Sequence, residues 1–290
     1  CLLNDSFVSL DTIPNLLSQT AAVAIAGAGM TLIITAGGFD LSIGAMLTLI
    51  TVVLSKALPR TGIWPAIALA MGAAAACGAF NGLIVTRLGI QTFVATLATM
   101  MLFRGMAELF SGGRDIPISL EKFPEIKQFS YTAWLGILTV GTYLATWVIY
   151  HRTRLGIRIR AIGSSQSAAW SSGISVNAVR LLLFVFVALT TGMAGLITTS
   201  QLAMGGAKLG VGFELEVITV VILGGTALSG GRGRLGGTLV ATVLLGMMRM
   251  ALDLFGVKDE YLRLLAVGGL LMAALAINGL RSRRGQEVEE

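Results

Sequence analysis

The sequence predicts an all-α protein, a polytopic transmembrane helical bundle of about nine spans in which some helices are short or broken. Hydrophobic residues make up 55% of the 290 residues and charged residues only 12%, whereas a soluble domain carries about 25% charged residues. Uncharged stretches recur nearly from end to end. Many of the 37 glycines lie inside them, and Gly72, Gly78 and Gly82 offer a flat surface on which helices can pack closely in lipid.

Nine uncharged stretches are candidate crossings. A bilayer requires roughly 20 apolar residues per helix, a length that only some of the stretches reach. The shorter ones, such as 41–55 and 235–248, either recruit flanking charged side chains that snorkel, such as Arg249, or enter the bilayer and turn back. The nine stretches are 20–39, 41–55, 63–85, 88–103, 128–150, 181–207, 217–231, 235–248 and 264–280.

Charge distribution sets the expected orientation. Nine crossings place the two ends of the chain on opposite sides. Arginines cluster without a single acid in 151–180, and Arg281, Arg283 and Arg284 form a second cluster in the tail 281–290; such clusters usually face the cytoplasm. We therefore expect one transmembrane domain over 1–290, with 1–19 as an external lead-in, 151–180 as a cytoplasmic loop and 281–290 as a cytoplasmic tail.

Residues that carry out chemistry are scarce. Cys1 and Cys77 cannot build a disulfide framework, and the one histidine, His151, lies among arginines. No Ser/His/Asp set, Cys/His set or metal-ligand spacing can be assembled, so the sequence predicts neither an enzyme nor a metal site. The net charge of +6 fits lipid headgroups better than nucleic acid, because no basic stretch alternates with stacking aromatics.

The run Gly231-Arg-Gly-Arg-Leu-Gly236 has the spacing of a dinucleotide-binding turn. That fingerprint requires a βαβ unit in a water-accessible domain, whereas both flanks here are apolar runs typical of membrane segments. No Walker-type phosphate loop occurs either. We expect no cofactor to be bound by this chain, so that any ATP must be bound by another.

The segment 37–44 joins the first two apolar stretches. Gly37 and Gly38 permit a sharp reversal of the chain, and Asp40 or Ser42 can then cap the N–H groups of the next helix. A carboxylate this close to two spans is costly unless it is satisfied. The pattern favours a structural turn over direct contact with a substrate.

The segment 161–175, inside the expected cytoplasmic loop, predicts a short helix with one large aromatic side chain. Trp170 stands among small and polar residues, which is typical of an anchor at a protein interface; a helix lying on the lipid surface is the alternative. The residues that start, propagate and end this helix are Ser164, Ser165, Ala168, Ala169 and Gly173.

Ionisable residues near the span ends occur in groups. Two of the groups join an acid and a base four residues apart, so that they can share a helix face and neutralise each other. This favours interfacial salt bridges over a proton relay. The groups are Arg104 with Glu108, Glu214 with Glu216, and Arg249 with Asp253.

Four separated motifs resemble one family. They are GGFDLSIG at 37–44, NGLIVTRLGIQTFVATLATMMLFRG at 81–105, AIGSSQSAAWSSGI at 161–174 and GFELEVITVVILGGTALSGGRGRLGGT at 212–238. In this order they are similar to the permease subunits of bacterial ABC importers for monosaccharides, of the ribose, xylose, arabinose and galactoside class. The resemblance covers almost the whole chain.

The resemblance implies a multi-pass subunit of the bacterial inner membrane that pairs with a second copy or a paralogue. A separate cytoplasmic ATPase would bind ATP and Mg²⁺, and a periplasmic binding protein would deliver the sugar. Residues 1–19 would then be periplasmic, the C-terminus cytoplasmic, and 161–174 the coupling helix that docks on the ATPase. Such permeases usually have about ten spans, the first of which precedes a segment similar to 4–19 here.

We therefore expect a permease that passes a pentose or hexose inward by alternating access. Alternatives are a related permease for nucleosides, branched-chain amino acids or a furanose-type signal molecule, a stand-alone carrier driven by an ion gradient, and a membrane enzyme or scaffold. The polar and aromatic residues expected to line the path are Asn81, Thr92, Phe93, Thr96 and Thr99.

Overall fold

The computed structural model describes residues 12–254 and 256, and beyond them 262, 265, 266, 268–270, 272 and 276. Its helices are α1 (Thr12–Thr35), α2 (Ile43–Thr61), α3 (Ile63–Arg87), α4 (Thr92–Ser111), α5 (Thr132–Arg152), α6 (Arg154–Ser164), α7 (Gln166–Ser171), α8 (Val176–Leu202), α9 (Phe213–Leu223) and α10 (Leu235–Leu254), with a 3₁₀ helix η2 (Pro124–Ser130). The only strands in the described part are β1 (Ile116–Pro117) and β2 (Met204–Gly205). The all-α fold class is confirmed.

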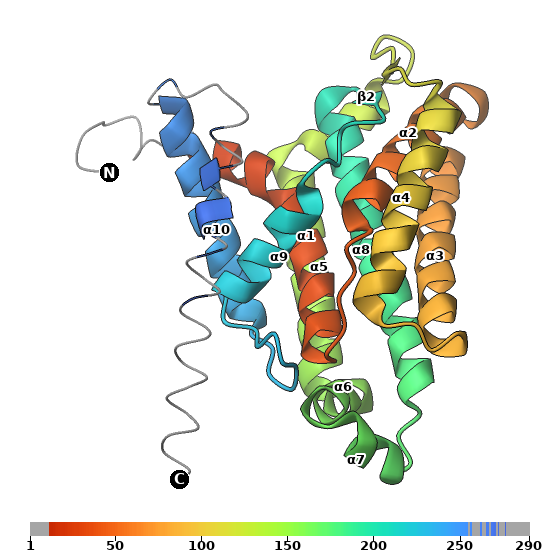
Figure 1. The fold of residues 1–290 in the computed structure, drawn as a ribbon. Helices are drawn as coiled ribbons and strands as arrows, with labels where there is room; N and C mark the ends of the chain where they lie inside the picture. The colour runs from red at the N-terminus through yellow and green to blue at the C-terminus, as the bar shows by residue number, and fades with distance from the viewer. Residues whose placement is uncertain are drawn as a thin grey trace.

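Seven helices of the described part are long and apolar enough to cross a membrane: α1 to α5, α8 and α10. They stand side by side as a bundle (Figure 1). The expected count of nine is not reached in these residues. Only 217–223 of the stretch 217–231 is helical, as part of α9, which has 11 residues. Most of 264–280 lies outside the described residues, as does the expected tail 281–290.

Two of the short uncharged stretches become full spans by recruiting flanking charged residues. Residues 43–55 of the stretch 41–55 lie in α2, which reaches 19 residues by including Lys56 and Arg60. The stretch 235–248 lies in α10, which reaches 20 residues by including Arg249.

The bundle has an inner and an outer set of helices. Within the apolar window of each span, 78% of α1, 72% of α2 and 61% of α8 is buried, against a third or less of α3, α4, α5 and α10. The outer helices expose large apolar side chains such as Leu109 and Val140. Such surfaces are stable only against lipid or another protein, which fits a membrane location.

Close packing of α3 on α8 depends on glycine. A Cβ atom at Gly78 would lie 2.5 Å from the Phe184 carbonyl oxygen, and one at Gly82 would lie 2.6 Å from Leu181 Cδ1. Gly72 on the same helix faces open space. The predicted packing role is therefore confirmed for Gly78 and Gly82, whereas the α8 contact does not involve Gly72.

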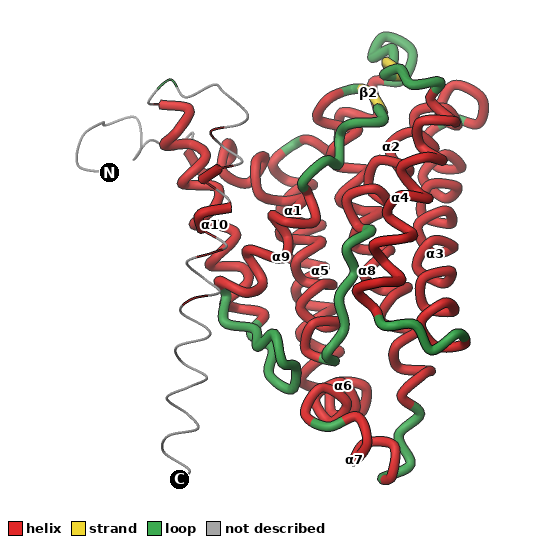
Figure 2. The backbone as a smooth tube through the Cα atoms, in the orientation of Figure 1, coloured by secondary structure: helices red, strands yellow, loops and turns green. Residues whose placement is uncertain are grey.

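The two ends of the bundle differ (Figures 1 and 2). At one end, α6 and α7 lie beside the loop 224–234. At the other end, β1 pairs with β2 in an antiparallel ribbon, Ile116 opposite Gly205. α1 begins at Thr12, inside the segment 1–19 that was expected to precede the first span.

Candidate functional site

The chain between α1 and α2 is not helical. α1 ends where Gly37, at φ 76°, donates its N–H to Ile34 O and Gly38 donates to Ile33 O, each at 2.9 Å. These two bonds are the usual glycine termination of a helix. The chain then runs back along the bundle to the start of α2 (Figure 2). Residues 36–42 are called the α1–α2 break below.

Two threonines of α4 satisfy the main chain of the α1–α2 break. The Phe39 N–H donates to Thr92 Oγ1 at 3.3 Å, and the Leu41 N–H donates to Thr96 Oγ1 at 3.1 Å. In hydrocarbon no water is present to satisfy such groups, so non-helical backbone requires partners within the protein. α4 therefore supports the break along its length.

Asp40, Ser42 and Asn81 form a polar cluster at the same place, and all three are fully buried. The Ser42 hydroxyl donates to Asp40 Oδ1 at 2.6 Å and the Ser42 N–H donates to the same oxygen at 2.9 Å. Asn81 Nδ2 of α3 donates to Ser42 Oγ at 2.8 Å and to Asp40 Oδ2 at 3.3 Å. The cluster fastens the α1–α2 break to α3.

The expectation that Asp40 or Ser42 caps α2 was wrong. Ser42 is the N-cap residue of α2, but its side chain makes no capping bond; its hydroxyl instead donates to Asp40 Oδ1 and accepts from Asn81 Nδ2. Asp40 accepts from the N–H of Ser42 itself. The physical reason is burial, since a carboxylate inside the bundle requires the nearest donors for itself.

The structure brings three of the five predicted pathway residues, Asn81, Thr92 and Thr96, onto the α1–α2 break. Thr99 is buried further along α4 and donates to the Thr96 carbonyl oxygen at 3.3 Å. Phe93 is half exposed. The sequence analysis did not predict that Asn81, Thr92 and Thr96 support the α1–α2 break. Contact of the five residues with a substrate stays a prediction.

α6 is seated on the ends of the spanning helices. Thr153 caps it, its hydroxyl accepting from Leu155 N at 3.2 Å, and Ile159 and Ile162 are buried in the main core. A Cβ atom at Gly163 would overlap the Thr35 carbonyl oxygen at the end of α1 and Gly231 N in the loop 224–234. α6 is therefore packed directly against the end of α1.

α7 is the short helix predicted within 161–175. Ser165 is its N-cap and accepts from Ala168 N at 3.3 Å. Gly173, at φ 79°, ends it by donating to Trp170 O at 2.9 Å, and Ile174 N donates to Ala169 O at 3.0 Å. The roles of Ser165 and Gly173 are confirmed. Ser164 is instead the last residue of α6.

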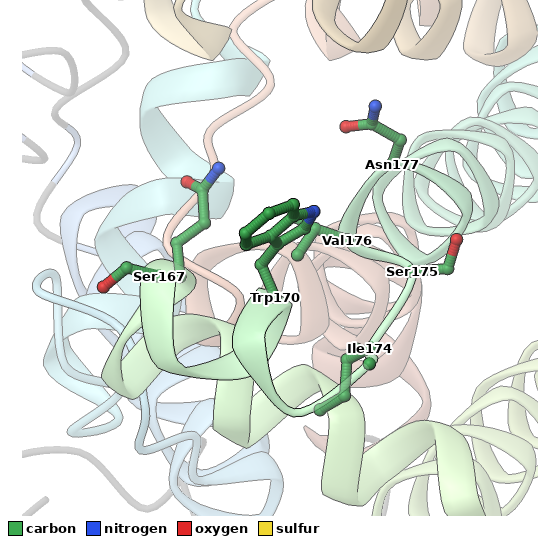
Figure 3. A pocket seen from close by; sticks show the side chains of 8 residues that line it. Ser167, Trp170, Ile174, Ser175, Val176 and Asn177 are labelled. Carbon is green, nitrogen blue, oxygen red and sulfur yellow. The ribbon is translucent and has the colours of Figure 1, made fainter.

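Trp170 is 73% exposed, whereas the preceding Ala169 is 3% exposed and packs into the core. A groove of about 790 Å³ separates α7 from the start of α8 and is lined by Trp170, Gln166 and Asn177 among others. Figure 3 shows the indole projecting into this groove. An exposed aromatic ring on a helix that is capped at both ends is a preorganised contact surface.

A second cavity, of about 720 Å³, shares Gln166 and Asn177 with the groove and continues to Thr92 and Phe93. Arg180 of α8 also lines it and donates to Gln166 Oε1 at 2.8 Å. The sequence analysis did not predict a functional role for Gln166 or Asn177. It used Arg180 only as one of the arginines that set the membrane orientation. Predicted pathway and coupling residues thus border adjoining cavities.

The glycine-rich run 231–236 does not form a dinucleotide site. The apolar residues before it form helix α9 rather than a strand. Its N–H groups are also used within the protein, since Gly231 N donates to Thr35 O at 2.8 Å and Gly233 N donates to Tyr150 OH at 3.1 Å. The loop therefore joins α1, α5 and α6 at this end of the bundle.

Comparison with known families assigns the class of protein. Residues 12–275 match the family described as the branched-chain amino acid transport system / permease component. This chain belongs to that family of transport permeases. It is thus a multi-pass inner-membrane transport subunit rather than an enzyme.

Several curated relatives match over nearly the whole chain. The ribose import permease protein RbsC of Bacillus subtilis is 36% identical over 97% of this chain and 88% of its own length. The protein of the same name from Escherichia coli is 34% identical over 95% and 88%. The D-allose transport system permease protein AlsC of Escherichia coli is 31% identical over 96% and 86%. No solved structure matches this chain.

Proposed function

We propose that this chain is the permease subunit of an ABC importer that moves a monosaccharide, a pentose or hexose, into the cytoplasm. The observation that carries the proposal is its similarity, over more than nine-tenths of the chain, to permeases named for ribose and D-allose. The family description names branched-chain amino acids, which keeps an amino-acid permease as the second candidate.

Energy would enter through α6 and α7. A separate cytoplasmic ATPase would bind ATP and Mg²⁺ and dock on α7 around the exposed Trp170 ring. One contact and one sequence neighbour support transmission from there: Gly163 of α6 lies against the Thr35 carbonyl group, and Thr35 directly precedes the α1–α2 break. The proposed docking residues are Ser164, Ser165, Ala168, Ala169, Trp170 and Gly173.

The sugar would leave toward the same end. Thr92 and Phe93 line the cavity beside α7, which supports their place on the exit path, with Asn81, Thr96 and Thr99 deeper in the bundle. A periplasmic binding protein would deliver the sugar at the opposite end, and the C-terminus would be cytoplasmic. The exposed apolar faces of the outer helices would contact lipid and a second permease, identical or paralogous.

Reconstitution tests the proposal. The permease is placed in liposomes with its ATPase and binding protein, and uptake of radiolabelled ribose, xylose, arabinose, allose and galactose is measured with and without ATP. ATP-dependent uptake of at least one sugar is expected, with none when the ATPase is omitted. Uptake that persists without the ATPase and responds to ionophores would establish an ion-driven carrier, and uptake of leucine alone would establish the second candidate.

Docking is tested with two tryptophans of similar exposure. Trp170 on α7 is 73% exposed and Trp64 at the start of α3 is 65% exposed. We expect Trp170→Ala to weaken ATPase association at least tenfold in a pull-down titration, and Trp64→Ala to leave it unchanged. Equal association for Trp170→Ala and the unaltered protein would contradict the docking role.

A further inference from the structure

One face of α5 is apolar along the span and basic at its end. α5 is an outer helix, and only 22% of its apolar window is buried. Exposed apolar side chains follow its helical repeat of three to four residues, which places them on one face. The next positions on this face are His151 and Arg152, the last two residues of α5, and both are exposed. The apolar residues of the face are Ile137, Val140, Leu144, Trp147 and Val148.

Trp147 holds the basic end of this face in position. The Arg152 guanidinium carbon lies 5.4 Å from the centre of the indole ring, and the His151 ring stacks on the same indole with the ring centres 5.4 Å apart. A cation over an aromatic face is attracted by the electrons of the ring. Tryptophan side chains are enriched where a span meets the lipid headgroups. The stacking therefore directs the Arg152 charge to the headgroup level of the bilayer.

α6 extends the positive surface beyond the end of α5 (Figure 1). Arg154 and Arg158 are four residues apart and exposed, so they share the outer face of α6 with the exposed Ile157. Arg160 Nη1 donates to the Tyr150 carbonyl oxygen at 3.0 Å, which fastens α6 to α5. Basic residues around an apolar side chain are typical of helices that lie at a membrane surface.

This surface lacks an opposite charge. It is called the α5–α6 corner below and consists of Trp147, His151, Arg152, Arg154, Ile157 and Arg158. The sequence contains no acid between 151 and 180. Within the part of the chain that the structure describes, the only salt bridge joins Glu216 to Arg249. The arginines of the corner therefore have no acidic partner among the described residues.

The charge of the corner argues against a protein as its occupant. A second copy of the chain, packed face to face, would bring the same positive charges together. A soluble ATPase would leave the apolar face of α5 uncovered, because that face lies within the span. A molecule that carries a negative group on apolar chains matches both parts of the surface.

We propose that the α5–α6 corner binds an anionic phospholipid. The phosphate group accepts hydrogen bonds from the Arg152 guanidinium, while Arg154 and Arg158 add to the attraction and an acyl chain lies along the apolar face. Ile137 and Trp147 are ten residues apart on α5, about 15 Å, which is one leaflet of a hydrocarbon core of about 30 Å. Basic clusters directly beside a span are typical of anionic lipid recognition. The inference goes beyond the proposed function and does not depend on which solute is carried.

Lipid retention tests the proposal. The full chain is delipidated in detergent and titrated with phosphatidylglycerol or with phosphatidylcholine of the same acyl chains, and bound lipids are counted by native mass spectrometry. The unaltered protein should retain more phosphatidylglycerol, and added salt should reduce the preference. Arg152→Gln should weaken retention of phosphatidylglycerol about fivefold, because each basic residue near an anionic headgroup contributes to the attraction.

Arg87→Gln is the matched control. Arg87 is an exposed arginine that ends α3, and the residues around it border the same cavity as Gln166 of α7, which places it at the same end of the bundle. It has no aromatic ring beneath it in the described part of the chain. Arg87→Gln should keep the lipid preference of the unaltered protein, and a loss equal to that of Arg152→Gln would reduce the effect to net charge and overturn the proposed site.

The indole is tested without removing a charge. Trp147→Leu keeps every arginine and an apolar side chain, but Arg152 loses the ring over which it lies. Retention of phosphatidylglycerol should fall about two- to fivefold, and Trp147→Phe should recover part of it. Unaltered retention in Trp147→Leu would contradict the positioning role of the indole.

Other occupants give distinct results. Equal retention of the two lipids by the unaltered protein would overturn the inference. So would an Arg152→Gln protein that retains phosphatidylglycerol normally and instead loses the ATPase in a pull-down titration, or loses a second copy of the chain in the mass spectrum. Those results would assign the corner to a protein partner. None of these measurements uses sugar uptake, so failure of the proposed function would leave the inference standing.

Discussion

The Thr96 hydroxyl of α4 accepts a hydrogen bond from the Leu41 N–H at 3.1 Å and donates one to the Thr92 carbonyl oxygen at 2.8 Å. A single side chain therefore satisfies the main chain of the α1–α2 break and remains bonded within its own helix. A serine or threonine that bonds back to its own helix is common. The contact with Leu41 makes Thr96 essential to the geometry of the break.

Removing that hydroxyl should destabilise the protein. In Thr96→Val the Leu41 N–H stays buried without an acceptor, which costs about 1–3 kcal/mol. Thr99→Val is the matched control, because the Thr99 hydroxyl bonds only to its own helix. Thermal unfolding in detergent, followed by tryptophan fluorescence, measures both variants. Equal unfolding temperatures would show that another group satisfies Leu41.

The buried Asp40 carboxylate should depend on Asn81. Asn81→Leu removes the donor to Ser42 and to Asp40, and leaving these buried acceptors without it costs about 1–3 kcal/mol. Asp40→Asn in the same background should recover part of this stability, because it removes the carboxyl group that lacks its donor. The four proteins of this double-mutant cycle are compared by thermal unfolding. A purely additive cycle would contradict the coupling.

Gly78 should tolerate no side chain, whereas Gly72 should. A methyl group at Gly78 would lie 2.5 Å from the Phe184 carbonyl oxygen, and one at Gly72 meets nothing within 4 Å. Overpacking of this kind costs about 1–3 kcal/mol, while Gly72→Ala should be neutral or slightly stabilising because alanine is the better helix former. The amount of monodisperse protein after heating compares the two. Similar survival of both variants would show that α3 and α8 can separate without cost.

Gly163→Ala should uncouple ATP hydrolysis by the ATPase from sugar uptake through the permease. Its methyl group would overlap the Thr35 carbonyl group and displace α6 from α1, whereas a methyl group at Gly236 meets nothing within 4 Å. We expect Gly163→Ala to bind the ATPase and hydrolyse ATP with reduced uptake, and Gly236→Ala to behave as the unaltered protein. Normal uptake by Gly163→Ala would show that the contact between Gly163 and the Thr35 carbonyl group does not couple ATP hydrolysis to transport.

Local signals allowed part of the fold to be predicted. The apolar stretches specify the spans, because hydropathy is a property of the sequence itself. The ends of α7 were predictable as well, since Ser165 and Gly173 supply an N-cap and a residue at positive φ whatever their surroundings. The half-length of α9 was not, because hydropathy carries no information on where an apolar run stops being helical.

Contacts between distant segments could not be read from the sequence. Thr92 and Thr96 were predicted to face a sugar, but a row of hydroxyls on a helix looks the same whether it serves a ligand or a backbone 53 to 55 residues away. Arg249 pairs with Glu216 of α9, a partner that its four-residue spacing to Asp253 did not indicate. Both outcomes depend on which helices become neighbours.

The supports of the α1–α2 break constrain how the nascent chain can enter the bilayer. Leu41 leaves the ribosome 55 residues before Thr96, so its amide has no acceptor when the first two helices are complete. A translocon that released them into lipid at that stage would strand polar main chain in hydrocarbon. We therefore expect α1 to α4 to partition into the bilayer together, after α4 has been synthesised.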